Sequence, residues 1–243
     1  MAHSTPNISE SEAVVHLHSA TSIVGDERLS STAVWNALID TSTWPRWNAF
    51  VPRVTIREQP SQQATSAGSH RDDESGNNAG RQLSPILQLG TRMTFHVDMS
   101  AGASSSSKNN KNSDSPRNLQ ETPLVVTVFE PPDSASKKPG RIVWAGDSTG
   151  PGGFSEWLLR AERTHEIYEE TKTEDGRVQV RVTNRELQTG VLAYAVRWMY
   201  GQTLQRCFER SVEDLRSRTM EQENGTGSMD TNGNTAVIRS ITP

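Results

Sequence analysis

Apolar and polar residues alternate along most of this chain, and the alternation predicts a series of β-strands. In residues 13–24, Val15 and Leu17 alternate with two histidines, and a period of two is typical of a half-buried strand. The last two predicted strands are long and meet across residues 174–176, a hairpin turn signal. The same period predicts six strands beyond the first, over residues 51–57, 91–99, 124–130, 141–147, 157–170 and 177–187.

The strand at 91–99 shows the alternation most clearly. Met93, Phe95, Val97 and Met99 share one face, and polar residues share the other. We therefore expect one face of this strand to be buried and the other to be solvated.

Two segments follow a helical period instead. Residues 26–40 predict a short helical region, capped within residues 30–32 and buried through Val34 and Leu38. Residues from Gly190 to about Glu221 predict a long helix with charged residues on its outer face. The apolar stripe of this helix is Ala193, Val196, Tyr200, Leu204, Cys207, Ser211 and Leu215.

Polar stretches interrupt these elements at residues 59–85, 100–118 and 221–234. They contain too few apolar side chains to offset the entropy of ordering them. We expect one domain over residues 13–221, with disordered insertions at 59–85 and 100–118 and flexible tails at 1–12 and 222–243.

Composition narrows the classes of partner. The apolar fraction is 33% with a mean hydropathy of −0.66, low for a fully packed chain. The net charge of −4 gives no basic field, so we expect no nucleic-acid partner. The single cysteine, Cys207, excludes an intrachain disulfide. His16 and His18 lack a third ligand at metal-binding spacing, and we expect neither metal nor cofactor.

No run of the sequence is long enough to span a membrane, and the first twelve residues contain no apolar segment typical of a secretory signal. We therefore expect a cytoplasmic location. Transient membrane contact and the oligomeric state stay open.

A tryptophan-rich motif follows the short helix. Val34 to Asp40 leads directly into Trp44-Pro45-Arg46-Trp47-Asn48, and three of the six tryptophans lie within this region. The motif resembles the first helix and following loop of the START-like, or SRPBCC, superfamily. Residues 90–220 are also similar to that superfamily, nearest to its coenzyme-Q-binding and polyketide-cyclase-like branches. The similar segments are the strand around Trp144, the glycine-rich turn 150–153, and Glu186 to Gly190.

The resemblance implies an α+β helix-grip fold. In this fold a curved antiparallel sheet of about seven strands wraps a long C-terminal helix, and a hydrophobic ligand lies between them. Two features depart from the coenzyme-Q-binding branch: residues 163–165 are polar where that branch has aromatic side chains, and a mitochondrial presequence is missing. The candidate ligand-binding residues are Trp44, Trp47, Phe95, Trp144, Arg163, His165, Glu186, Val196, Tyr200 and Leu204. The two tryptophans of the motif fit a cavity wall or an ordinary core equally well.

Glu186 is the most informative charged residue, because it shares a strand face with Val180, Val182 and Asn184. A carboxyl group that points into an apolar cavity has a raised pKa, suited to holding a ligand hydroxyl or moving a proton. The alternative, which we favour, is a structural ion pair with Arg163 or Arg197.

Arg163 and His165 have the same parity as Ala161 and Ile167, which favours an inward position for both. A single β-bulge would bring Glu162, Thr164 and Glu166 inward instead.

Three functions follow. The first is noncatalytic binding or carriage of a lipid, quinone, polyketide or similar apolar molecule. The second is a cyclase or aromatase in which Glu186, or Arg163 with His165, moves protons. The third is a protein–protein interaction module. A binder needs a closed apolar cavity, an enzyme needs polar groups converging inside it, and an interaction module needs an exposed apolar patch.

Overall fold

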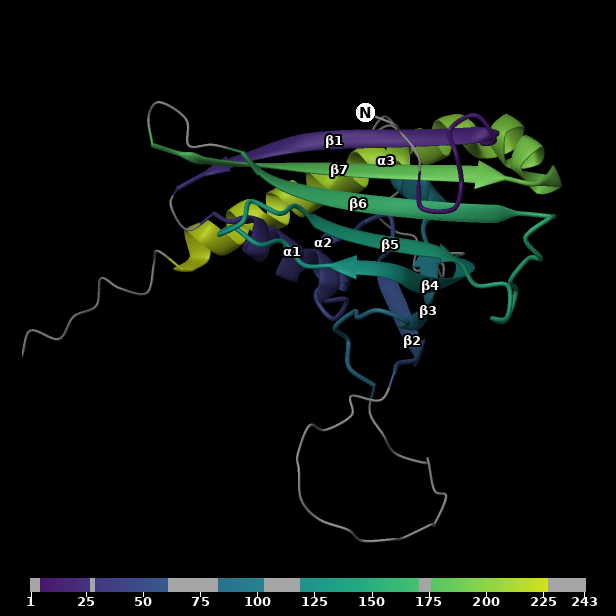
Figure 1. Ribbon diagram of the computed structural model, residues 1–243, viewed down its shortest axis with the longest axis horizontal. Coiled ribbons are helices and arrows are strands. Elements are labelled where there is room, and N and C mark those ends of the chain that lie inside the picture. Colours follow the sequence, from purple (N-terminus) through teal and green to yellow (C-terminus); the bar gives the residue numbers. More distant parts are fainter. Residues whose placement is uncertain (1–4, 27–28, 61–82, 103–118, 171–175, 227–243) are drawn as a thin grey trace, which may run out of the picture.

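The computed structural model describes residues 5–26, 29–60, 83–102, 119–170 and 176–226 (Figure 1). Within these residues, seven strands form one antiparallel sheet and a long helix ends the chain. The elements in order are β1 (Val15–Gly25), α1 (Ser31–Ile39), α2 (Trp44–Trp47), β2 (Arg53–Glu58), β3 (Arg92–Val97), the 3-10 turn η1 (Met99–Gly102), β4 (Gln120–Glu130), β5 (Gly140–Gly146), β6 (Arg160–Glu170), β7 (Val178–Thr189) and α3 (Val191–Thr226).

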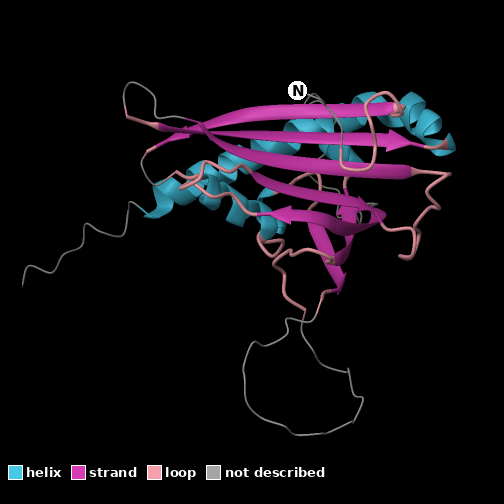
Figure 2. Ribbon diagram, viewed as in Figure 1, coloured by secondary structure: helices cyan, strands magenta, loops and turns pink. Residues whose placement is uncertain are grey.

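The sheet has the strand order β1-β7-β6-β5-β4-β3-β2. The first strand thus pairs with the last, with Val15 opposite Gln188. Helix α3 runs alongside the sheet (Figure 2) and contacts β1 and β7, while α1 contacts α3, β5 and β6. This arrangement confirms the predicted α+β helix-grip fold.

The tryptophan motif packs the short helices against the sheet. Trp44 is only 2% exposed, and its indole Nε1 donates to the carbonyl of Leu38 at 3.2 Å. Its ring lies 5.4 Å from Phe95 on β3 and 6.4 Å from Trp144 on β5. Buried aromatic contacts of this kind fix α2 against two strands.

Strand β3 differs from its prediction. It ends at Val97, so Met99 lies in η1 and not on the strand. Its polar face is also buried, because Arg53 and Thr55 of β2 contact the two ring nitrogens of His96 at 2.9 and 2.8 Å. The alternation predicted which residues share a face, but it did not predict that neighbouring side chains would cover the polar face.

The predicted N-terminal tail is also different. Ile8 is 1% exposed, and Asn7 donates from its backbone N and its Nδ2 to the Glu162 carboxylate at 3.0 and 2.6 Å. Thr5 and Ile8, which the sequence assigned to a tail, are thus buried against the domain, whereas residues 10–12 are exposed. Most of the two predicted insertions lies outside the described residues, as does most of the predicted C-terminal tail. At the other end of the domain, α3 continues past the predicted residue 221 to Thr226.

Candidate functional site

Three rows of side chains cross the face of the sheet that α3 covers. They are Ile142-His165-Asn184, Trp144-Arg163-Glu186 and Ala161-Gln188, each joining directly paired positions on adjacent strands. Directly opposite residues have Cβ atoms about 4.5–5.5 Å apart, so each row is contiguous. Arg163 bonds to α3 whereas Glu162 bonds to the N-terminal segment on the other face. Arg163 and His165 therefore point inward, which is one of the two arrangements that the sequence left open.

A cavity of about 470 Å³ lies between these rows and α3. Its apolar walls come from both layers: Phe50, Phe95, Val97, Met99, Leu124, Trp144 and Leu159 on one side, and Val196, Tyr200, Leu204 and Phe208 of α3 on the other. The polar groups Arg163, Glu186 and Gln188 also line it. A volume of about 300–1,000 Å³ with apolar walls and a few polar groups is usual for a small-molecule site.

Arg163 is a fixed cation in this cavity. Its Nε donates to Asn184 Oδ1 at 3.0 Å, and its Nη2 donates to Ser211 Oγ on α3 at 3.3 Å. The guanidinium lies 4.2 Å from the centre of the Phe208 ring and 5.4 Å from that of Phe50. Burial lowers the pKa of Arg163 to about 10, which still leaves it charged at neutral pH. These contacts hold a positive charge against the apolar wall.

Glu186 is half-buried and opens onto the same cavity. Burial raises its pKa, and the positive charge of Arg163 and a hydrogen bond from Gln188 Nε2 at 2.5 Å oppose this effect only in part. Among the described residues, no ion pair within 4 Å joins Glu186 to Arg163 or Arg197, so the favoured structural ion pair does not form. Arg197 is exposed and lines a groove beside β1. The cavity therefore contains a carboxyl group that is easier to protonate than an ordinary glutamate.

His165 lies one layer deeper. Burial and the charge of Arg163 hold its pKa well below the ordinary histidine value, so the ring is neutral. Its ring centre is 4.8 Å from that of Trp144. Within the described part of the chain, His165 Nδ1 and Trp144 Nε1 have no hydrogen-bond partner.

The structure brings most of the predicted site residues together. The residues on the cavity surface are Phe95, Trp144, Arg163, Glu186, Val196, Tyr200 and Leu204. Trp44, Trp47 and His165 instead line a void of about 10 Å³ behind that surface. A role in ligand binding stays a prediction for each of the ten residues. Trp44, Trp47 and His165 would affect a ligand only indirectly, by supporting the side chains of the cavity wall.

Several wall residues were missing from the predicted set, and Phe208, Gln188 and Phe50 show why. Phe208 follows Leu204 by four positions, so the helical period could have identified it. Gln188 has the same strand parity as Glu186 and could have been found in the same way. Phe50 lies between α2 and β2, where no period applies.

Asp147 anchors the loop at the cavity rim. Its carboxylate accepts from Arg57 of β2 and Arg92 of β3, each at 2.6 Å, and from the Thr149 hydroxyl at 2.7 Å. Burial alone would raise its pKa, but the hydrogen bonds from Thr149, Arg57 and Arg92 together hold that pKa well below the ordinary value. These bonds tie the loop between β5 and β6 to the far edge of the sheet.

The described residues contain no group of three or more histidine, cysteine or acidic side chains placed to hold a metal ion. None of the helices in the described ranges is both long enough and apolar enough to cross a membrane.

The fold and the cavity together define a helix-grip protein with a mostly apolar cavity that opens to solvent at one rim. No family model matches the sequence. A relative from Penicillium oxalicum, the oxopyrrolidines biosynthesis cluster protein O, is 37% identical over 189 residues, which cover 77% of this chain and 79% of the relative. The chain belongs to the family of that protein.

Solved structures of other proteins are similar to this chain in fold. A hypothetical protein from Helicobacter pylori matches with a TM-score of 0.52 at 14% identity, over 90% of this chain and 99% of that one. The Zhui aromatase/cyclase from a Streptomyces species matches with a TM-score of 0.48 at 10% identity, over 87% of this chain and 97% of that one. The first similarity supports the fold alone, and the second is too distant to bear on function.

Proposed function

We propose that this protein binds an apolar small molecule between its sheet and α3, as a component of secondary-metabolite biosynthesis. The observation that carries the proposal is the cavity of about 470 Å³, with walls that are mostly aliphatic and aromatic. The name of the Penicillium oxalicum relative supports a biosynthetic setting, because it assigns that protein to an oxopyrrolidine biosynthesis cluster. A polyketide-like ligand agrees with this setting better than a bulk membrane lipid does.

The polar row Trp144-Arg163-Glu186 orients the ligand. Arg163 is held by Asn184 and Ser211, so its guanidinium offers a fixed donor to a ligand carbonyl or enolate oxygen. Glu186, with its raised pKa, accepts a hydrogen bond when ionised and donates one when protonated. The apolar body of the ligand then lies along Phe95 and Leu204.

A second candidate is catalysis of a cyclase or aromatase kind, and one observation favours it. Glu186 has a raised pKa, opens onto the cavity and lies directly opposite Arg163 in the sheet. A carboxyl group poised in this way can move a proton while the adjacent cation stabilises an enolate.

Native mass spectrometry of the protein purified from its own host would identify the retained ligand. We expect an apolar molecule of a few hundred daltons with one polar end, a size that a cavity of 300–1,000 Å³ accepts. A protein that carries no small molecule and takes up none of its host's apolar metabolites would contradict the proposal.

Glu186→Gln then separates binding from catalysis. For a binder, the variant loses ligand affinity by no more than about tenfold, the value of one hydrogen bond. For an enzyme, affinity is kept and turnover of the retained ligand falls by about two to four orders of magnitude. Glu121→Gln is the matched control, because Glu121 lines the same cavity but its side chain is 64% exposed. We expect this control to change neither quantity.

A further inference from the structure

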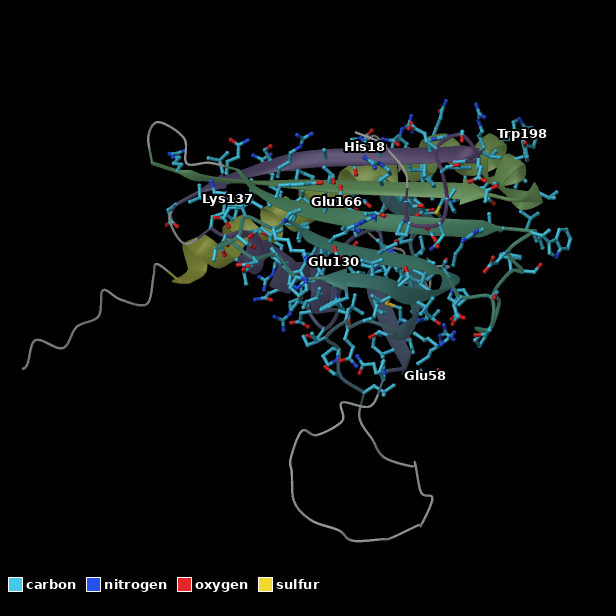
Figure 3. All side chains as sticks on the ribbon, in the orientation of Figure 1. His18, Glu58, Glu130, Lys137, Glu166 and Trp198 are labelled. Atoms are coloured by element: carbon cyan, nitrogen blue, oxygen red, sulfur yellow. The ribbon has the colours of Figure 1, made fainter. Side chains whose placement is uncertain are left out.

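The outward side of α3 is apolar in its first turns and charged further along the helix. In its first two turns that side presents Val191, Tyr194 and Trp198, which are 62%, 66% and 86% exposed. Figure 3 labels Trp198 at this end of the helix. Further along the helix the exposed side chains include Glu209 and Glu213, as expected for a solvated face. The first turns therefore present an apolar stripe that nothing in the described chain covers.

A neighbouring loop extends this stripe. The backbone N of Val191 donates to the carbonyl of Trp157 at 3.4 Å, and that of Leu192 donates to Leu158 at 2.9 Å. Trp157 itself is 71% exposed. The backbone bonds place the exposed Trp157 next to the start of this stripe, and Trp157, Val191, Tyr194 and Trp198 together are called here the aromatic face.

The apolar area of the aromatic face lies at the upper end of the range for a monomer. Since tryptophan and tyrosine each present about 150–250 Å², the four exposed side chains and adjacent Met199 offer roughly 600 Å² of apolar area. The largest apolar patch of an ordinary monomer is about 300–600 Å² and is often functional. Two such faces in contact would bury about 1,200 Å², the lower end of the range for stable protein interfaces.

We propose that the aromatic face binds a second copy of this chain. Val191, Tyr194 and Trp198 are spaced by three and four residues, the stripe that two helices use to pack on each other. The small side chain of Ala195 lies within the stripe and allows close approach. A two-fold axis through the stripe makes the contact self-complementary.

A lipid surface is the main competing occupant, and charge disfavours it. The chain has a net charge of −4, and Arg197 is the sole cationic side chain among residues 191–200. Helices that lie on anionic membranes are instead rich in Lys and Arg on their polar side.

The proposed contact would also steady the cavity. Val196 and Tyr200 line the cavity from the same turns of α3 whose outer side carries the aromatic face. Pairing of two copies would therefore restrain this part of the cavity wall.

Sedimentation velocity of the full chain over a range of micromolar concentrations tests the proposal. We expect a dimer whose dissociation constant rises at least about 30-fold in Trp198→Glu, since a buried tryptophan is a typical interface hot spot. Ser217→Glu is the matched control, because it adds the same charge at an exposed position of the same helix. This control should remain dimeric, and both variants should keep the wild-type circular dichroism spectrum, which shows that the protomer is still folded.

A monomeric wild-type protein would overturn the proposal, as would a Trp198→Glu variant that dimerises normally. Flotation with phosphatidylcholine vesicles distinguishes the competing occupant. A monomer that binds these vesicles through Trp198 would assign the aromatic face to a lipid surface instead.

Discussion

Phe208→Ala tests the contact between α3 and the sheet. The Phe208 ring is 1% exposed, lies 6.0 Å from the Phe50 ring and covers the Arg163 guanidinium at 4.2 Å. Truncating a buried phenylalanine costs about 3–5 kcal/mol. A cation–π contact adds on the order of 1 kcal/mol to that cost. Because the ring borders the cavity, its neighbours can relax into the space, and we expect a net loss of about 4 kcal/mol.

Urea unfolding monitored by tryptophan fluorescence measures this loss, at one protein concentration so that any self-association contributes equally to all variants. The thermal midpoint should fall by on the order of 10 °C. Phe154→Ala is the matched control, since Phe154 lines the same cavity but is 48% exposed. It should cost less than about 1 kcal/mol. Equal losses for the two variants would refute the placement of α3 on the sheet.

Three further perturbations follow from the structure. Gly190→Ala should destabilise the protein by about 1–3 kcal/mol in urea unfolding, because Gly190 has φ +100 and an added Cβ would lie 2.7 Å from the Leu158 carbonyl oxygen. An unchanged midpoint would contradict this close packing between Gly190 and Leu158. The folded pKa of Asp147 lies below its unfolded value, so its stabilisation is present above about pH 4 and is lost as the pH falls further. Asp147→Asn should therefore have a lower thermal midpoint than the wild type at neutral pH, and its midpoint should fall less than that of the wild type below pH 4. Midpoints that fall in parallel in both proteins would contradict this role of Asp147. The sequence predicts that the insertions at 59–85 and 100–118 are dispensable for folding, so deleting their greater part, residues 61–82 and 103–118, should move the thermal midpoint by no more than a few degrees. Loss of cooperative unfolding would show that they belong to the core.

Local patterns predicted the elements because a strand or helix face is set by neighbours a few residues away. Alternation predicted β7 from its valines, and the stripe from Val196 to Leu204 predicted the inner side of α3. The pairing of β1 with β7 joins residues more than 150 positions apart, so no period could predict it, and the resemblance predicted only a curved antiparallel sheet. Likewise, nothing local distinguishes the packed segment around Ile8 from a tail.

The site was predictable in its residue types and less so in its geometry. The parity of β6 allowed Arg163 to point inward only if the strand had no bulge there, and periodicity cannot exclude a bulge. The partners of Arg163, which are Asn184 and Ser211, come from a second strand and a helix. Trp44 looked equally suited to wall and core, because both bury an indole; its contacts with Phe95 and Trp144 place it in the core. Such choices depend on contacts between distant segments, which no single-segment pattern contains.

The central claim is that the cavity holds a small molecule, and filling the cavity tests it most directly. Ala161 lines the cavity beside Gln188, and Ala161→Phe would occupy that space. Ala20→Phe is the matched control, because Ala20 is exposed on β1 and does not line the cavity. In native mass spectrometry of proteins purified from the same host, we expect the wild type and Ala20→Phe to retain the same ligand and Ala161→Phe to lose it. Equal retention by Ala161→Phe would contradict the claim.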